Sequence, residues 1–202
     1  NMTKNKLTTA PVTRYGAYAQ DLIGVNKYLK LLVGVRYSNI ESESNVYTYS
    51  TDKTVNSSAK DHAFSPKGGI IFQPNRYHSL FASYSNSFSL NTGVDVNGNA
   101  LDPSIIDQYE VGVKNKFFHR KLSVNLTAYQ ISNSNLAQIS LENGNTNSNI
   151  KELAGATRGR GVELDMEYRP TENLSIMGGY SYTKTIYTAS NTYIVGSELR
   201  YN

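Results

Sequence analysis

The feature that most constrains the fold is a strict alternation of apolar and acidic side chains near the C-terminal end of the sequence. Along residues 162–168 the alternating residues are Val162, Glu163, Leu164, Asp165, Met166, Glu167 and Tyr168. A β-strand sends successive side chains to opposite faces, so this strand has one apolar face and one face with three carboxylates. A water-soluble β-sandwich can use such a strand, and so can a membrane barrel with lipid outside and water inside.

The same two-residue period predicts about eight strands and no membrane-spanning helix. The predicted strands cover residues 14–25, 28–38, 64–73, 77–88, 107–117, 122–141, 156–168 and 174–188. The most apolar run, residues 29–35, is interrupted by Lys30 and is far shorter than the roughly 20 residues that a membrane helix needs. A helical membrane protein is therefore excluded, and the chain is predicted to be all-β.

The connections between these strands alternate between short and long, which favours the barrel over the sandwich. Short connections at residues 26–27, 74–76, 118–121 and 169–173 alternate with long polar ones at 39–63, 89–106, 142–153 and 188–202. Outer-membrane barrels have short periplasmic turns and longer extracellular loops. The pattern predicts a transmembrane antiparallel barrel in which the long connections lie outside the cell.

Composition and side-chain spacing argue against several other classes of function. The chain has no cysteine, a net charge of +4 and no run of Lys and Arg, so nucleic-acid binding has no support. His62, His78 and His119 lack metal-ligand spacing, and the three carboxylates of residues 163–167 have no histidine near them in sequence. We expect no catalytic residue, no resident metal, no cofactor and no enzymatic activity.

Seven short segments stand out in order along the chain: YAQD at 18–21, GVRY at 34–37, FSPKGG at 64–69, LFASYSNSF at 80–88, YEVGVK at 109–114, GVEL at 161–164 and GYSYT at 179–183. Together these segments resemble TonB-dependent siderophore receptors. The resemblance implies about eight strands of a 22-stranded barrel with a plugged lumen in the bacterial outer membrane. Residues 1–202 would then be part of a single β-barrel domain, with the plug domain and the C-terminal strands lying outside this sequence.

The resemblance also implies a function and a set of partners. By analogy, the receptor would take up a ferric siderophore, with energy delivered by the TonB protein through the plug. Outer-membrane lipid would surround the barrel. A small passive barrel or porin without a plug is the alternative, and an outer-membrane enzyme is a third possibility that would require a Ser/His or Asp/His group at the rim.

Candidate ligand contacts lie near the predicted external ends of the strands. In this family, aromatic and arginine side chains at that end line the vestibule that receives the chelate, which points to Tyr47, Tyr49, Phe88, Arg158, Arg160 and Tyr187. The aromatic residues could instead form the girdle at the lipid boundary. The charges predicted to point inward are Arg36, Glu110, Lys114, Lys116, Glu163, Asp165 and Glu167; they either contact a plug or line a water-filled lumen.

Overall fold

Most of the chain forms one large curved antiparallel sheet, and two short strands near the C-terminal end form a separate sheet. The computed structural model describes the backbone of residues 5–195 and 198–201. The strands are β1 (Lys6–Thr9), β2 (Val12–Gly24), β3 (Leu29–Thr48), β4 (Lys53–Asn75), β5 (His78–Ser89), β6 (Ser104–Phe117), β7 (Leu122–Ile139), β8 (Lys151–Thr171), β9 (Leu174–Ala189), β10 (Thr192–Val195) and β11 (Glu198–Tyr201). A 3₁₀ turn, η1 (Glu142–Gly144), lies between β7 and β8.

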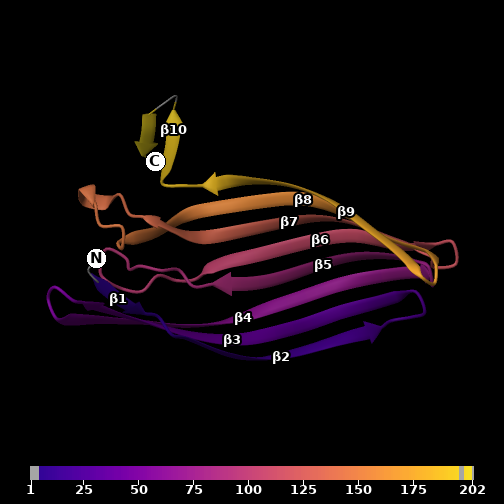
Figure 1. Ribbon diagram of the computed structural model, residues 1–202, viewed down its shortest axis with the longest axis horizontal. Coiled ribbons are helices and arrows are strands. Elements are labelled where there is room, and N and C mark those ends of the chain that lie inside the picture. Colours follow the sequence, from indigo (N-terminus) through magenta and orange to yellow (C-terminus); the bar gives the residue numbers. More distant parts are fainter. Residues whose placement is uncertain (1–4, 196–197, 202) are drawn as a thin grey trace.

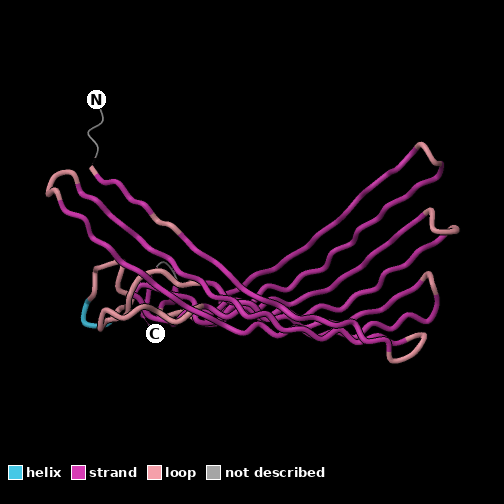
Figure 2. The backbone as a smooth tube through the Cα atoms, turned by 90° about the horizontal axis from the view of Figure 1, so that it is seen from below, coloured by secondary structure: helices cyan, strands magenta, loops and turns pink. Residues whose placement is uncertain are grey.

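Strands β2 to β9 correspond to the eight predicted strands. Each pairs antiparallel with the next, and they lie side by side in chain order (Figure 1). Strand β1 continues the line of β2 along the edge of β3, after a break at Ala10 and Pro11. Seen from below, the strands form a single bent layer (Figure 2). The prediction of an all-β antiparallel sheet is confirmed.

The short connections are held by asparagine side chains at two of the predicted turns. The side-chain oxygen of Asn26 accepts hydrogen bonds from the backbone N–H of Tyr28 at 2.8 Å and of Leu29 at 3.0 Å. Asn75 does the same for Tyr77 at 2.8 Å and His78 at 3.1 Å. An asparagine that bonds the backbone two or three residues ahead imitates a backbone turn, so these residues fix the reversals locally.

Two of the predicted long connections are wrong in part. Residues 39–63 were expected to form a loop, but β3 and β4 remain paired through almost all of it, and only residues 49–52 lie between them. The last predicted loop, 188–202, contains the paired strands β10 and β11, while residues 196, 197 and 202 lie outside the described part. Strands that extend beyond the lipid meet water on both faces, so their sequences lose the apolar alternation that reveals a strand.

Within the described residues, no second layer of protein covers the large sheet. Among the described residues, Ile40 is the single large hydrophobic side chain that is buried. Val162 and Met166 are 41% and 46% exposed, although they belong to the apolar face of β8. A sandwich would cover this face with a second sheet, and the structure shows it uncovered. No helix within the described residues is both long enough and apolar enough to cross a membrane.

The pairing register carries each face of the sheet across the six strands from β3 to β8. Residues that are directly opposite in an antiparallel pair share a face. On one face, a continuous line of such pairs begins at Gly34 on β3 and runs through Lys67, Ser85, Gln108 and Ile131 to Gly159 on β8. Arg36 lies two residues from Gly34 on β3 and therefore shares its face. With strict alternation along each strand, this line places all seven predicted inward charges on one face, which confirms that prediction. We call this face, with Arg36, Lys114 and Glu163, the inner face; the opposite face, with Val35, Val113 and Val162, is the outer face.

Candidate functional site

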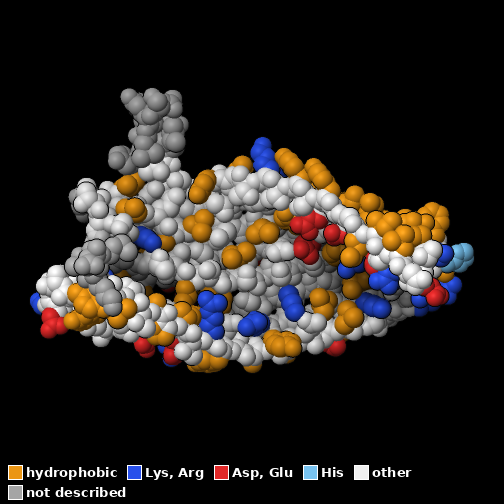
Figure 3. Space-filling view, in the orientation of Figure 1, with side chains coloured by type: hydrophobic (Ala, Val, Ile, Leu, Met, Phe, Trp, Pro, Cys, Tyr) orange, Lys and Arg blue, Asp and Glu red, His pale blue; other side chains and the backbone are white. Residues whose placement is uncertain are grey.

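The inner face is the hollowed face of the molecule, and its charges fall mainly into two sectors of opposite sign, although Lys114 and Lys116 share β6 with Glu110. Lys and Arg side chains gather over the lower strands of the hollow, and Asp and Glu gather over the upper strands (Figure 3). By register, the basic sector consists of Arg14, Lys30, Arg36 and Lys67 on β2 to β4, and the acidic sector consists of Glu110, Glu163, Asp165 and Glu167 on β6 and β8. Such a surface offers an anion and a cation different places to bind.

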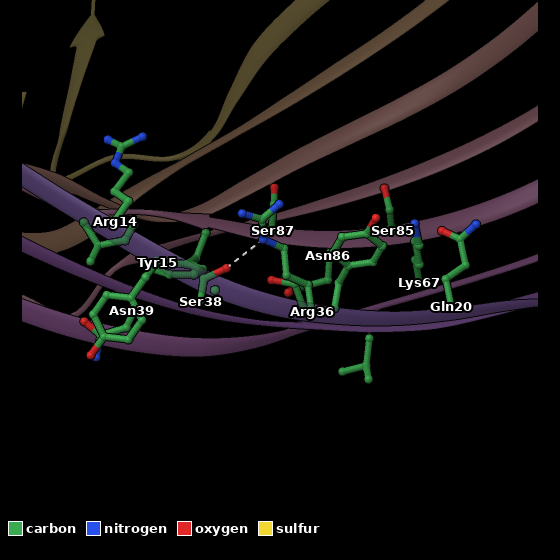
Figure 4. Close-up of a pocket in the computed structure, with 16 residues that line it drawn as sticks. Arg14, Tyr15, Gln20, Arg36, Ser38, Asn39, Lys67, Ser85, Asn86 and Ser87 are labelled. Atoms are coloured by element: carbon green, nitrogen blue, oxygen red, sulfur yellow. Dashed lines mark hydrogen bonds between the residues drawn. The ribbon is translucent and has the colours of Figure 1, made fainter.

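A groove of about 710 Å³ lies over the basic sector, between β2 and β5. Its lining includes Arg14, Arg36 and Lys67, with Gln20 and Ser85 supplying uncharged hydrogen-bonding groups. Figure 4 shows these five residues on adjacent strands. Guanidinium, ammonium and hydroxyl groups in one open groove suit a ligand with several oxygen acceptors.

Local features of β3 and β4 hold the groove's basic side chains in place. The Arg36 Nε donates a hydrogen bond to the Ser38 hydroxyl at 3.0 Å, two residues along the same face (Figure 4). The Lys67 side chain lies across Gly34, its partner on β3, and a Cβ at position 34 would lie 2.8 Å from Lys67 Cε. Glycine at this position therefore makes room for the lysine stem, which explains a residue type that otherwise weakens a strand.

In the acidic sector, Glu167 forms an ion pair with Arg169, and the other carboxylates have polar neighbours rather than ion pairs. Glu110 accepts hydrogen bonds from the Gln108 amide at 2.5 Å and from the Ser83 hydroxyl at 3.5 Å. Asp165 lies in register with Asn125, and Asn125 with Lys114, so one strand separates this carboxylate from the nearest lysine in its row. Two strand spacings amount to about 10 Å, and unit charges at that distance are well screened by water and salt. Glu163 and Asp165 have no ion pair among the described residues, so they can meet a partner from the lumen.

Next to the acidic sector, an aromatic ring covers a glycine. The Tyr129 ring on β7 lies over Gly161 on β8, and its hydroxyl group is hydrogen-bonded to the Thr183 hydroxyl on β9. A Cβ at Gly161 would lie 2.5 Å from the ring and 2.6 Å from the Tyr182 carbonyl oxygen. The glycine allows Tyr129 to lie flat and to link three strands, beside the carboxylate of Glu163.

The six predicted ligand contacts do not form one cluster. Tyr47 and Tyr49 lie together at the β3–β4 hairpin tip, with ring centroids 4.9 Å apart, and the Tyr47 hydroxyl donates to Asp52 at 2.7 Å. Phe88 borders the basic groove, but by register Phe88 and Tyr47 belong to the outer-face rows of Val113 and Val35. Tyr187 pairs with Thr157, which places it on the inner face of β9, where it is 72% exposed.

Arg158 and Arg160 also lie on the outer face of the sheet. They pair with Ile186 and Lys184 of β9, and the register continues without a shift to Val162 opposite Tyr182. Both arginines therefore share the outer face with Val162, whereas the family resemblance had suggested the vestibule. Their even numbers match that of Val162, so the parity signal was already present in the sequence.

The basic groove was not visible as a unit in the sequence. Arg14 and Lys67 are 53 positions apart, and they approach through the pairings of Tyr18 with Arg36 and of Gly34 with Lys67. The signal that could have revealed them is the parity of each basic residue relative to the tight turns at residues 26–27 and 74–76. Within the described residues, no three His, Asp or Glu side chains form a group that could hold a metal ion.

Comparison with known proteins decides the family. Residues 4–202 match the family described as TonB dependent receptor-like, beta-barrel. The chain belongs to the TonB-dependent receptor family. It is part of an outer-membrane β-barrel, as the two-faced single layer of strands indicates.

The relatives of this TonB-dependent receptor chain include several named metal-chelate receptors. It is 29% identical over 182 residues to the metal-pseudopaline receptor CntO of Pseudomonas aeruginosa, which covers 89% of this chain and 25% of the relative. It is 32% identical over 179 residues to the ferrichrome outer membrane transporter/phage receptor of Escherichia coli, covering 88% and 23%. The chain thus spans about a quarter of the length of these curated relatives.

Solved structures show the same fold. The siderophore receptor PiuA of Acinetobacter baumannii superposes with a TM-score of 0.79 over 96% of this chain and 28% of that structure, at 21% sequence identity. The ferripyoverdine receptor of Pseudomonas aeruginosa gives a TM-score of 0.71 over 89% of this chain and 23% of that structure, at 19% identity. At these identities the likeness shows the barrel fold.

Proposed function

We propose that this chain is part of the wall of a receptor that takes up a ferric siderophore across the outer membrane, with energy supplied through TonB. The observation that carries the proposal is the charged groove on the inner face of a sheet whose outer face is apolar and uncovered. The family membership supports it, and relatives are named as receptors for metal-pseudopaline, ferric-pyoverdine and ferrichrome.

In this proposal the chain binds and guides its ligand without covalent chemistry, and it is not an enzyme. The aromatic side chains of Tyr47, Tyr49, Phe88 and Tyr187 provide flat apolar surfaces for a bulky chelate at the external end. Arg36 and Lys67 then attract carboxylate, hydroxamate or catecholate oxygens toward the lumen. Other barrel strands and a plug domain, supplied by chain beyond this sequence, complete the ligand site.

The plug is the proposed partner of the acidic sector as well as the link to TonB. Carboxylates that lack an ion pair on the inner face, such as Glu163 and Asp165, offer contacts to basic side chains of a domain inside the lumen. Energy transmitted through that domain would loosen those contacts and open a path for the chelate. A lumen without a plug would leave the same charges in contact with water, as in the passive-barrel alternative.

The experiment uses the full-length protein that carries this sequence, expressed in an outer membrane without other siderophore receptors. Uptake of ⁵⁵Fe is followed with ferrichrome, ferric pyoverdine and ferric pseudopaline as probes. We expect at least one probe to enter, and a protonophore that collapses the inner-membrane gradient to stop entry while binding at the surface remains. Entry of every probe at an unchanged rate after the gradient is collapsed would instead identify a passive barrel.

A double variant tests the role of the groove. Arg36→Gln with Lys67→Gln removes two positive charges and keeps the side chains polar, so binding of an anionic chelate is expected to weaken by about tenfold or more. Lys114→Gln with Lys116→Gln is the matched control, because it removes the same charge from the inner face outside the groove. An equal loss in both variants would mean that net charge, rather than the groove, sets the affinity.

A further inference from the structure

Two external connections of the sheet are joined to each other by backbone hydrogen bonds. They are residues 90–103, between β5 and β6, and residues 140–150, between β7 and β8 (Figure 1). The Val94 N–H donates to the Asn149 carbonyl at 3.0 Å, and the Lys151 N–H donates to the Val94 carbonyl at 2.8 Å. These bonds form a parallel bridge between Val94 and Ile150. We call the two joined segments the lip.

The residues next to the bridge favour this contact. The Lys151 ammonium donates to the Thr92 hydroxyl at 3.1 Å, which adds a side-chain link beside the backbone bonds. Gly93 has a φ of +102°, and a Cβ there would lie 2.7 Å from the Asn149 carbonyl oxygen. The close approach of the two backbones therefore requires glycine at this position.

Asn91 attaches the lip to the strands below it. Its side-chain amide donates to the carbonyl oxygens of Asp102 at 2.7 Å and Asn135 at 2.8 Å. Its side-chain oxygen accepts from the Ser104 hydroxyl at 3.0 Å and the Ala137 N–H at 3.3 Å. An asparagine side chain has two donors and two acceptor sites, so all four are used. One side chain thus connects the β5–β6 segment, the start of β6 and strand β7.

An irregularity in β7 makes the Asn135 carbonyl available to Asn91. The register between β7 and β8 shifts after Asn133, and Asn135 has a φ of 57°. A bulge leaves its extra residue unpaired in the ladder, so the Asn135 carbonyl accepts from side chains instead. Ser104, which is 3% exposed, donates to the same carbonyl at 3.0 Å. A buried polar network whose members are all paired is rigid.

The end of β9 is tied to the strands that carry the lip. Two residues after this strand, the Asn191 side-chain amide donates to the Ile139 carbonyl at 2.8 Å and to the Glu152 carboxylate at 2.7 Å. Its backbone N–H donates to the Gln138 side chain at 2.9 Å. The last residues of β7 and the first of β8 are therefore held from both sides, by Asn91 and by Asn191.

The long β3–β4 hairpin has no such links. Within the part of the chain that the structure describes, no hydrogen bond joins residues 38–63 to the lip. Outside its own ladder, this hairpin is bonded to β1, β2 and the residues beside them, such as Glu43 N–H to the Pro11 carbonyl at 3.0 Å. Proteins open locally in cooperative units, and these contacts divide the external end into two of them.

We propose that the lip is a single cooperative unit, which opens as a whole and keeps its shape while a ligand passes. Opening either segment breaks the Val94 bonds, and with them the contacts that hold the other segment. Such a lip presents a fixed rim, and adjustment to the ligand falls to other external segments such as the β3–β4 hairpin. The statement about ligand passage rests on the proposed function, whereas the cooperative unit does not.

Native-state hydrogen exchange of the full-length protein in detergent tests the unit. Asn91→Ala removes four hydrogen bonds and should lower protection by about tenfold or more in both segments. The informative amides are those of Asn145 and Ile150, because their bonds lie within the second segment and do not involve Asn91. The matched control is Asn86→Ala, which removes a bond to Asp107 on the outer face, outside the lip, and should leave these amides unchanged.

Three results of this experiment would overturn the proposal. Loss of protection confined to residues 90–103 would mean that the two segments open independently. Unchanged protection throughout would mean that Asn91 holds neither of them. An equal loss at Asn145 and Ile150 in the control would mean that the whole barrel, rather than the lip, had been destabilised.

A disulfide across the bridge tests whether the lip must come apart during uptake. Val94→Cys with Ile150→Cys places the two cysteines at bridge partners, whose Cα atoms are about 5 Å apart, a spacing that suits a disulfide. Uptake of ⁵⁵Fe from ferrichrome and ferric pyoverdine is measured with the full-length protein before and after reduction, and we expect equal rates.

The possible failures of this second experiment can be told apart. A reduced form that transports a probe and an oxidised form that does not would overturn the rigid lip. A protein that transports neither probe in either form would contradict the proposed function, and hydrogen exchange would still decide whether the lip is one unit.

Discussion

The two faces of the sheet can be tested by placing the same charge at adjacent positions of β7. Leu126 is on the outer face, 47% exposed, and pairs with Leu164; Thr127 is on the inner face and pairs with Glu163. Leu126 lies four residues from the start of β7, hence about 10 Å above the periplasmic turn and near the middle of the apolar band. An arginine at that depth costs about 2–4 kcal/mol in a barrel.

The predicted contrast is therefore large. Leu126→Arg should lower the free energy of unfolding by about 2–4 kcal/mol, a factor of about 30 to 1,000 in the folding equilibrium. Thr127→Arg should change it by no more than about 0.5 kcal/mol, because the new charge meets water and the carboxylate of Glu163. The measurement is urea unfolding of the full-length protein in phospholipid vesicles, followed by gel mobility. Equal costs at the two positions would refute the assignment of lipid to the outer face.

Three further predictions follow from single features of the structure. Because the chain has no cysteine, single cysteines can be introduced along β8; those replacing Glu163 and Asp165 should react with a water-soluble thiol reagent, and those replacing Val162 and Leu164 should be protected in a bilayer. Gly161→Ala should destabilise the barrel by about 1–3 kcal/mol in the same urea assay, since the new Cβ would meet both the Tyr129 ring and a backbone oxygen; a neutral result would contradict the close packing. In the external loop between β5 and β6, hydrogen bonds from Asn99 and Asn97 lower the pKa of Asp95. Its contribution to the order of that loop should be complete above the unfolded pKa of about 3.9 and lost as the pH falls through the lowered value. The protection of the Asn97 and Asn99 amides against hydrogen exchange should therefore fall in that acidic range. Protection that stays constant through the same pH range would contradict a role for the Asp95 carboxylate in ordering the loop.

Much of the fold could be predicted from local sequence features, namely the alternation of apolar and polar residues and the residues typical of turns. The alternation at residues 162–168 identified a two-faced strand, and the asparagines at 26 and 75 marked reversals that the structure builds with their side chains. The same rules failed at residues 39–63, because a strand that leaves the membrane has water on both sides and no longer needs one apolar face. A strand can be recognised from its alternating sequence only where one face meets lipid and the other meets water.

The sequence by itself determined which side chains alternate, where the chain turns, and to which family the ordered motifs pointed. Only the tertiary structure decided which distant charges became neighbours. Arg14, Arg36 and Lys67 form one groove because three strands pair in a particular register, and a shift by one residue would send them to opposite faces. The facing of Arg160 by Lys184 has the same origin, since pairing between strands depends on turn geometry and long-range contacts that no single strand encodes.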